Sequence, residues 1–244
     1  MIKCSLIFFV LIPIFCGCVQ NRFVCNSTIR LADTVSLKAK SVGIIDLSSS
    51  EIGDFPCDIL NYVNVNELNL FDTHLKSLPS NIDNLKNLKK LDLSWNEITS
   101  IPKEVFNLTN LEELIIYGSP DYELKLPSLK GISKLRKLKY LSLTSYSFTK
   151  IPREILKLES LEVLDLSAVG LNKLPRDIGK LKNLQELLIQ VNNDINKLPS
   201  SMKDLKKLEE LWMSGTGVYQ KDVDSLQKAL PNCKIYFSPN YGKE

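Results

Sequence analysis

Histidine is almost absent from this chain, because His74 is the single one among 244 residues. A serine–histidine–acid triad, or a metal site built from several histidines, is therefore not expected. An excess of one charge is also lacking, since 31 Lys and Arg face 28 Asp and Glu. This balance gives no general reason to expect nucleic acid as a partner. Glycine is sparse, and no Ser/Gly linker divides the chain, so one continuous architecture is expected.

Long apolar runs are lacking after the first eighteen residues. The one long apolar run of the chain covers residues 6–15 and is preceded by Lys3. A membrane-spanning helix needs about twenty apolar residues, so this run fits the apolar part of a secretory signal instead. The mature chain is expected to have no transmembrane helix.

The end of this run resembles a bacterial lipobox. It reads Phe15-Cys16-Gly17-Cys18. The resemblance implies a signal peptide over residues 1–17 and a diacylglyceryl group on Cys18. Plain secretion with cleavage near Gly17 is the alternative. Val19 follows the cysteine, and the absence of Asp there favours the outer membrane, with the side that the protein faces left open.

A repeat with a period of about 23 residues fills most of the remaining chain. Its copies start at Val42, Val65, Leu88, Leu111, Leu138, Leu161, Leu184 and Leu208. The template is LxxLxLxx(N)xLxxLPxxIxxLxx, and the third copy reads LKKLDLSWNEITSIPKEVFNLTN. This pattern resembles the leucine-rich-repeat family, in the 23-residue LPxxIxxLxx form of a bacterial leucine-rich-repeat lipoprotein.

The repeat predicts the fold class. The LxL alternation gives a short strand with two side chains inward, and stacked copies bury leucines that one copy leaves exposed. The resemblance implies an α/β repeat solenoid: a right-handed arc with a parallel concave sheet and short helical or 3-10 turns on the convex side. We divide the mature chain into residues 18–41 (lipidated cysteine, tether and N-terminal cap), 42–230 (about eight repeats) and 231–244 (closing strand and tail). Residues 224–237 are expected to form a helix followed by the closing strand.

Several copies depart from the template. The asparagine position holds Asn only at Asn96 and Asn192, so a continuous asparagine ladder is not expected; the others are Ser50, Thr73, Ser119, Tyr146, Val169 and Thr216. The fourth copy has four extra residues within 117–131, and the seventh has one within 190–199. Such insertions often lie on the binding side, and a tolerated bulge is the alternative.

The cysteines after Cys18 offer one candidate bridge. Cys25 and Cys57 would pin the cap to the first repeat in an oxidising compartment, with buried free thiols as the alternative. Cys233 is expected to pack as a small apolar residue. The spacings do not resemble a zinc site, and no metal or cofactor is expected.

The concave face is expected to be acidic. Positions two, three, five, seven and eight of each copy should point outward from the sheet. They hold eleven acids against the bases Lys89, Lys90 and Lys139, a net charge of −8 in a chain of net +3; the acids are Asp46, Glu67, Asp72, Asp92, Glu112, Glu113, Glu162, Asp165, Glu186, Glu209 and Glu210. A basic or mixed-charge protein would be steered there, and nucleic acid would be repelled.

The same positions carry large apolar side chains with no core to enter. Phe71, Trp95 and Tyr117 should be neighbours across adjacent strands. An aromatic cluster ringed by acids is typical of a protein-binding hot spot. The alternative is that the rings only cover one another and the loop backbone. The predicted partner-binding residues are Glu67, Phe71, Asp92, Trp95, Glu113, Ile115, Tyr117, Tyr140, Tyr146, Leu188 and Trp212.

Together these patterns favour a non-enzymatic lipoprotein that is exported and anchored in the outer membrane, monomeric, and bound to a protein through its concave face. The family resemblance suggests a host surface or matrix protein as partner. A periplasmic envelope scaffold, or a peptide- or glycan-binding protein, is the alternative. The repeats leave no room for a catalytic domain, so an enzyme is not expected.

Overall fold

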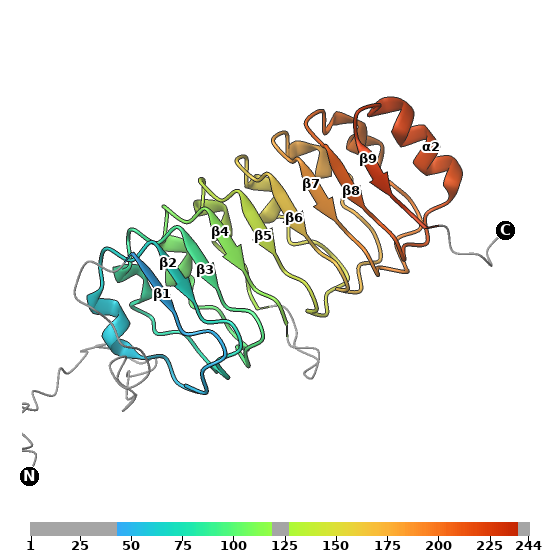
Figure 1. Cartoon of the computed structure of the whole chain (residues 1–244). Coiled ribbons are helices and arrows are strands. Elements are labelled where there is room, and N and C mark those ends of the chain that lie inside the picture. The colour runs from blue at the N-terminus through green and yellow to red at the C-terminus, as the bar shows by residue number, and fades with distance from the viewer. Residues whose placement is uncertain (1–42, 119–126, 239–244) are drawn as a thin grey trace, which may run out of the picture.

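The computed structural model describes residues 43–118 and 127–238. Within these residues nine short strands form one parallel sheet, and they follow one another in the sheet as they do in the sequence (Figure 1). The strands are β1 (Ile44–Asp46), β2 (Glu67–Asn69), β3 (Lys90–Asp92), β4 (Glu113–Ile115), β5 (Tyr140–Ser142), β6 (Val163–Asp165), β7 (Glu186–Leu188), β8 (Glu210–Trp212) and β9 (Lys234–Tyr236). The predicted solenoid arc is confirmed, with one strand from each of the eight repeats and a ninth, β9, from the closing segment.

The register of the sheet follows the repeat period. The middle residue of each strand pairs with the middle residue of the next, as Leu68 does with Leu91. The insertion in the fourth repeat leaves the register intact, because Leu114 still pairs with Leu141. Residues in equal repeat positions therefore lie side by side along the whole sheet.

Short 3-10 helices form the opposite, convex side. They are η1 (Cys57–Asn61), η2 (Ile82–Asn84), η3 (Lys103–Asn107), η4 (Ile132–Lys134), η5 (Ile155–Lys157), η6 (Ile178–Lys180) and η7 (Ser200–Asp204). A 3-10 helix rises about 2.0 Å per residue, so three to five residues are enough to cross this side of a short repeat. Successive turns pack tightly: a Cβ on Gly179 of η6 would clash with the carbonyl oxygen of Ser201 in η7.

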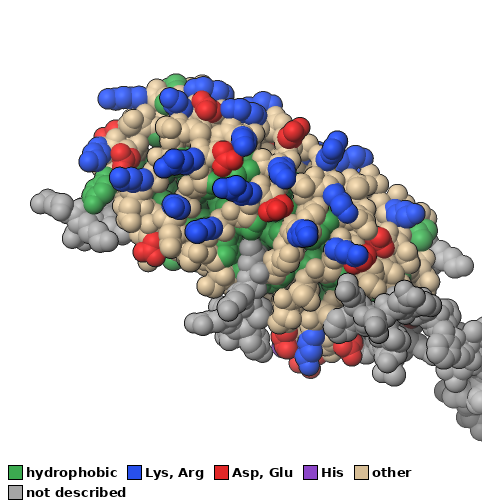
Figure 2. Space-filling view, turned by 180° about the vertical axis from the view of Figure 1, so that it is seen from behind, with side chains coloured by type: hydrophobic (Ala, Val, Ile, Leu, Met, Phe, Trp, Pro, Cys, Tyr) green, Lys and Arg blue, Asp and Glu red, His purple; other side chains and the backbone are tan. Residues whose placement is uncertain are grey.

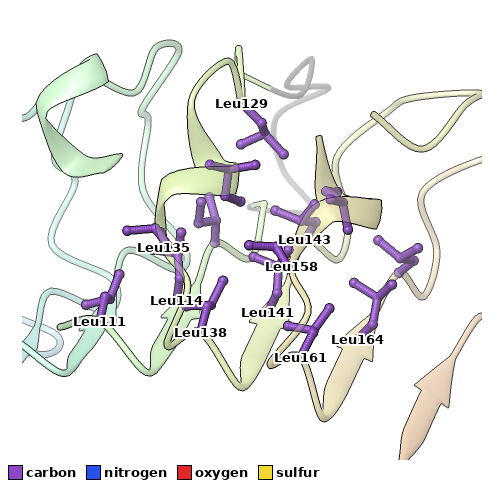
Figure 3. Packing of buried hydrophobic residues seen from close by; sticks show 14 of the residues in the cluster. Leu111, Leu114, Leu129, Leu135, Leu138, Leu141, Leu143, Leu158, Leu161 and Leu164 are labelled. Carbon is purple, nitrogen blue, oxygen red and sulfur yellow. The ribbon is translucent and has the colours of Figure 1, made fainter. Parts of the chain in front are cut away.

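The core is a stack of leucines and isoleucines between the sheet and the turns. Leu111, Leu138 and Leu161 occupy one column, and Leu114 and Leu141 belong to the next (Figure 3). All five are fully buried. Each repeat closes its neighbour's core, which is why a single copy would not be stable alone.

The C-terminal end of the arc is closed by α2 (Gln220–Ala229) and β9. The helix starts four residues before the segment 224–237 in which a helix and strand were expected. Val223 and Leu226 of α2 are buried against the last repeat. A ten-residue α-helix thus stands where the preceding repeats have a 3-10 turn.

Residues 1–42 lie outside the described residues, and with them the predicted signal peptide, the predicted lipidation site Cys18 and the predicted cap. Cys57 is disulfide-bonded, whereas Cys25 lies outside the described part, so the Cys25–Cys57 pairing stays a prediction. Cys233 is a free, buried thiol, and burial raises its pKa to about 11.

Candidate functional site

The outward side chains of the strands form two parallel rows on the concave sheet. The first row comes from the first residue of each strand and the second row from the third residue. We call these rows, with positions two, seven and eight of each repeat, the sheet face. The first row is Ile44, Glu67, Lys90, Glu113, Tyr140, Val163, Glu186, Glu210 and Lys234; the second is Asp46, Asn69, Asp92, Ile115, Ser142, Asp165, Leu188, Trp212 and Tyr236.

Three aromatic rings meet on this face, as the sequence predicted. The ring centroid of Trp95 lies 5.9 Å from that of Phe71 and 6.3 Å from that of Tyr117. Between Phe71 and Tyr117, the small Ser94 leaves room for the indole ring of its neighbour, and Ser94 itself is buried. We call Phe71, Trp95 and Tyr117 the tryptophan cluster; it joins three consecutive repeats.

The backbone of Trp95 is left-handed, with φ of 56°. Position eight has this conformation in most described repeats, because the chain turns out of the strand there; the residues are Ser49, Asp72, Trp95, Ser145, Ala168, Val191 and Gly215. A side chain with a Cβ costs about 1–2 kcal/mol in this region, and a bulky one is unusual. Trp95 is nevertheless 39 % exposed. The aromatic is thus held in a strained conformation at the surface.

A second apolar group lies at the C-terminal end of the sheet face. The rings of Trp212 and Tyr236 stack with centroids 3.7 Å apart, and Leu188 precedes them in the second row. The indole Nε1 of Trp212 donates a hydrogen bond of 3.1 Å to Glu210 Oε2. Beside them Val191, 60 % exposed, has the same left-handed backbone as Trp95. Sequence reasoning missed Tyr236 and Val191, although the repeat spacing places both on this face.

The lysines of the sheet face are paired with glutamates. Lys90 Nζ lies 2.8 Å from Glu113, and Lys139 and Lys89 lie 3.4 and 3.7 Å from Glu112. Lys234 of β9, which the sequence reasoning also missed, lies 3.6 Å from Glu210. These pairs are partly exposed, so each contributes little to stability.

The second-row aspartates have a structural role in addition to their charge. Asp46, Asp92 and Asp165 each accept a backbone N–H two residues on, at 2.9–3.0 Å, and so fix the chain as it leaves the strand. Burial raises the pKa of Asp165, against hydrogen bonds from Ser167 and Ser142 that lower it. These hydrogen bonds therefore hold the three carboxylates in fixed positions at the ends of their strands.

Tyr140 lies in the middle of the sheet face among carboxylates. Burial raises its pKa, and Asp165, Glu113 and Glu186 raise it further. The phenol stays neutral at physiological pH and is able to donate a hydrogen bond to a ligand.

Ten of the eleven predicted partner-binding residues lie on the sheet face, and Tyr146 does not. Tyr146 occupies the asparagine position, which points into the core, and it is only 2 % exposed. Burial raises its pKa to about 12. The structure therefore removes Tyr146 from the candidate surface.

The titratable side chains of the described residues form no group suited to a metal ion. Within residues 43–118 and 127–238, no three His, Cys, Asp or Glu side chains are grouped to hold a metal ion. His74 is an exposed loop residue whose Nδ1 lies 3.6 Å from Glu97. No helix in these same ranges is long and apolar enough to cross a membrane.

Family models match two parts of the chain. One described as a leucine-rich repeat region matches residues 121–232, and one described as a leucine-rich repeat matches residues 87–108. Among curated proteins, none matches this chain in sequence.

Several solved structures are similar in fold. A leucine-rich-repeat protein of Leptospira interrogans is 30 % identical, with a TM-score of 0.53 over 79 % of this chain and 60 % of the other. Internalin C2 of Listeria monocytogenes is 17 % identical, with a TM-score of 0.65 over 80 % of each chain. The ectodomain of a plant membrane receptor kinase from Arabidopsis thaliana, in complex with Casparian strip integrity factor 2, is 21 % identical, with a TM-score of 0.59 over 79 % of this chain and 26 % of the other. The chain therefore spans about 60 % of the Leptospira protein.

Proposed function

The chain is a leucine-rich-repeat protein, and we propose that it is a non-enzymatic lipoprotein that binds a protein partner through the sheet face. The observation that carries this proposal is the tryptophan cluster. Its three rings come from three repeats, and its central ring is exposed on a strained backbone.

The tryptophan cluster has the composition of a binding hot spot. Trp and Tyr are enriched among residues that dominate protein-protein binding, since they bury a large area at a low cost in conformational entropy. If the rings served only to cover Ser94, a residue without left-handed strain would do so at lower cost. An exposed strained ring at Trp95 is better explained by a ligand that it contacts.

The charge of the sheet face supports a partner that is basic or of mixed charge. Eleven carboxylates occupy its repeat positions, and its lysines are already paired with glutamates. An excess of negative charge attracts a basic surface and raises the rate of encounter more than the final affinity.

The predicted lipid on Cys18 supports a place in the bacterial outer membrane. Two or three acyl chains anchor a protein stably, whereas one alone holds it only weakly. We propose that the sheet face is presented outside the cell to a host surface or matrix protein. The receptor ectodomain, solved in complex with Casparian strip integrity factor 2, supports partner binding only by analogy of fold.

Protease accessibility on intact cells tests the location. We expect added protease to digest the protein on intact cells as it does in ruptured cells. Protection until rupture would overturn the surface location and favour a periplasmic scaffold or a peptide- or glycan-binding protein.

A pair of matched variants tests the binding surface. Trp95→Ala should weaken partner binding by about 30-fold, the loss typical of a hot-spot residue. Val63→Ala, which also trims an exposed apolar side chain, should leave binding unchanged, because Val63 lies outside the sheet face. The readout is the set of cross-linked proteins recovered with wild type and Val63→Ala but lost with Trp95→Ala. Equal recovery with all three chains would overturn the proposal.

A further inference from the structure

The convex side of the C-terminal half of the arc carries a dense group of basic side chains. We define the convex basic band as all Lys and Arg of residues 127–207 except Lys139, which belongs to the sheet face. It contains fifteen residues, against five acids that lie off the sheet face in the same repeats. Figure 2, seen from behind relative to Figure 1, shows Lys and Arg along the whole length of this side, with Asp and Glu fewer among them.

The band is arranged by the repeat period. Lys134, Lys157, Lys180 and Lys203 occur at intervals of 23 residues, in or at the end of successive 3-10 turns. Successive turns pack against one another, so these lysines form a row of like charges along the arc. Lys150 and Lys173, in the loops before the turns, belong to a second such row.

The charges of the band are largely uncompensated. Over residues 127–207 of the described chain, Asp177 and Lys180 make the one ion pair on this side, at 2.9 Å. Three other lysines donate instead to neutral side-chain amides: Lys134 to Asn107, Lys137 to Asn110 and Lys207 to Asn183. An amide oxygen accepts the hydrogen bond but does not cancel the charge of the lysine, so an external anion is still attracted.

The shape of the band selects the kind of anion. It extends over several rows and four repeats, which suits a plane of charge better than a single anionic strand. Most of its members are lysines, which act as point charges and do not need the bidentate geometry of Arg. Over the described residues 127–207, no aromatic side chain is fully exposed, so stacking platforms for nucleic-acid bases are not offered.

We propose that the convex basic band binds the headgroups of an anionic lipid surface. Each Lys or Arg near such a surface contributes to attraction, and several together give stable binding. In this orientation the band faces the membrane and the sheet face points away from it. The inference does not depend on the identity of the protein partner.

Vesicle sedimentation tests the proposal with the full chain. The probes are vesicles of phosphatidylcholine alone and vesicles in which about one third of the lipid is phosphatidylglycerol. The same N-terminal segment is present with both kinds of vesicle. The ratio of the affinity for anionic vesicles to the affinity for neutral vesicles therefore measures the effect of lipid charge. We expect at least about 20-fold tighter binding to the anionic vesicles, lost in about 1 M salt, where the Debye length falls to about 3 Å.

Matched lysine variants locate the surface. The triple variant Lys157→Gln, Lys180→Gln, Lys203→Gln should lose most of the preference for anionic vesicles. The control replaces Lys76, Lys86 and Lys103, exposed lysines of the second and third repeats, by Gln and should retain it. Equal loss in both variants would overturn the assignment to the band. Equal binding of the wild type to neutral and anionic vesicles would overturn the proposal of a lipid surface. Tight binding to heparin without binding to anionic vesicles would overturn it as well and would indicate a soluble polyanion as the ligand.

Discussion

Asn96 joins two repeats through its side-chain amide. Its Oδ1 accepts hydrogen bonds from the backbone N–H of Thr73, at 3.1 Å, and from the Thr73 hydroxyl, at 2.9 Å. The same oxygen accepts the N–H of Leu75, and Nδ2 donates to the carbonyl of Leu70. Asn96 therefore satisfies buried backbone groups of the preceding repeat that no water reaches.

Replacing Asn96 by Ala should strongly destabilise the protein. The change leaves several buried donors and acceptors without partners, each costing about 1–3 kcal/mol. We expect a loss of at least about 3 kcal/mol, measured as a shift of the urea unfolding midpoint. Asn110→Ala is the control, because the hydrogen bonds of the Asn110 side-chain amide are exposed. This variant should lose less than about 1 kcal/mol of unfolding free energy. Similar losses in both variants would contradict the interpretation.

Replacing Val191 by Gly should stabilise the protein. Val191 is β-branched, exposed and left-handed, with φ of 56°. Glycine removes a conformational cost of about 1–2 kcal/mol, which exceeds the entropy that it adds to the unfolded chain. Val63→Gly makes the same change at an exposed valine without positive φ, and it should destabilise. Thermal unfolding of the two variants should shift in opposite directions, and shifts of the same sign would refute the strain argument.

Asp165 should make stability depend on pH in a predictable way. Its pKa is raised in the folded state by burial, so the unfolded state ionises more readily and the charge destabilises the fold above that pKa. Asp165→Asn keeps an oxygen to accept the Ser167 amide and should stabilise the protein at pH 7. The gain should disappear as pH falls below the ordinary aspartate value of 3.8.

Asp46→Asn is the control for this effect. Asp46 makes the same bond to the amide two residues on, but it is exposed. Its replacement should change unfolding free energy little at either pH. An equal gain in both variants at pH 7 would mean that relief of general acidic repulsion, and not burial, is responsible.

Cys233 should be nearly inert in the folded protein. Burial raises its pKa to about 11, so at pH 8 the reactive thiolate is about 100-fold rarer than for an ordinary cysteine. Alkylation by iodoacetamide, followed by mass spectrometry, should label Cys233 only after urea is added. An engineered cysteine in Val63→Cys should react at once. Rapid native labelling of both thiols would show that the closing segment opens readily.

The fold was predictable because it rests on one repeated pattern. The spacing of Leu68, Leu91 and Leu114 determined strand, register and core together, and hydrophobic burial enforces it in every copy. The 3-10 form of the turns and the start of α2 at Gln220 were harder to predict from the sequence. Both depend on how many residues are left in the chain once the core positions are filled.

The candidate surface was predictable where position in the repeat alone decides which way a residue points. The meeting of Phe71, Trp95 and Tyr117 followed from the register. Tyr146 was assigned wrongly because it was grouped with the concave aromatics near it, whereas the asparagine position that it occupies points inward. The left-handed backbone of Trp95 was not foreseen, since no Gly or Asn marks it.

The turn at position eight of the repeats allows the side chain to differ while the backbone conformation stays the same. Ser, Asp, Trp, Ala and Val are all held there in one backbone conformation, and the strand before it keeps its register regardless. A substitution at this position carries a conformational cost confined to its own repeat. New recognition specificities are therefore able to evolve by single point changes at this position, without redesign of the scaffold.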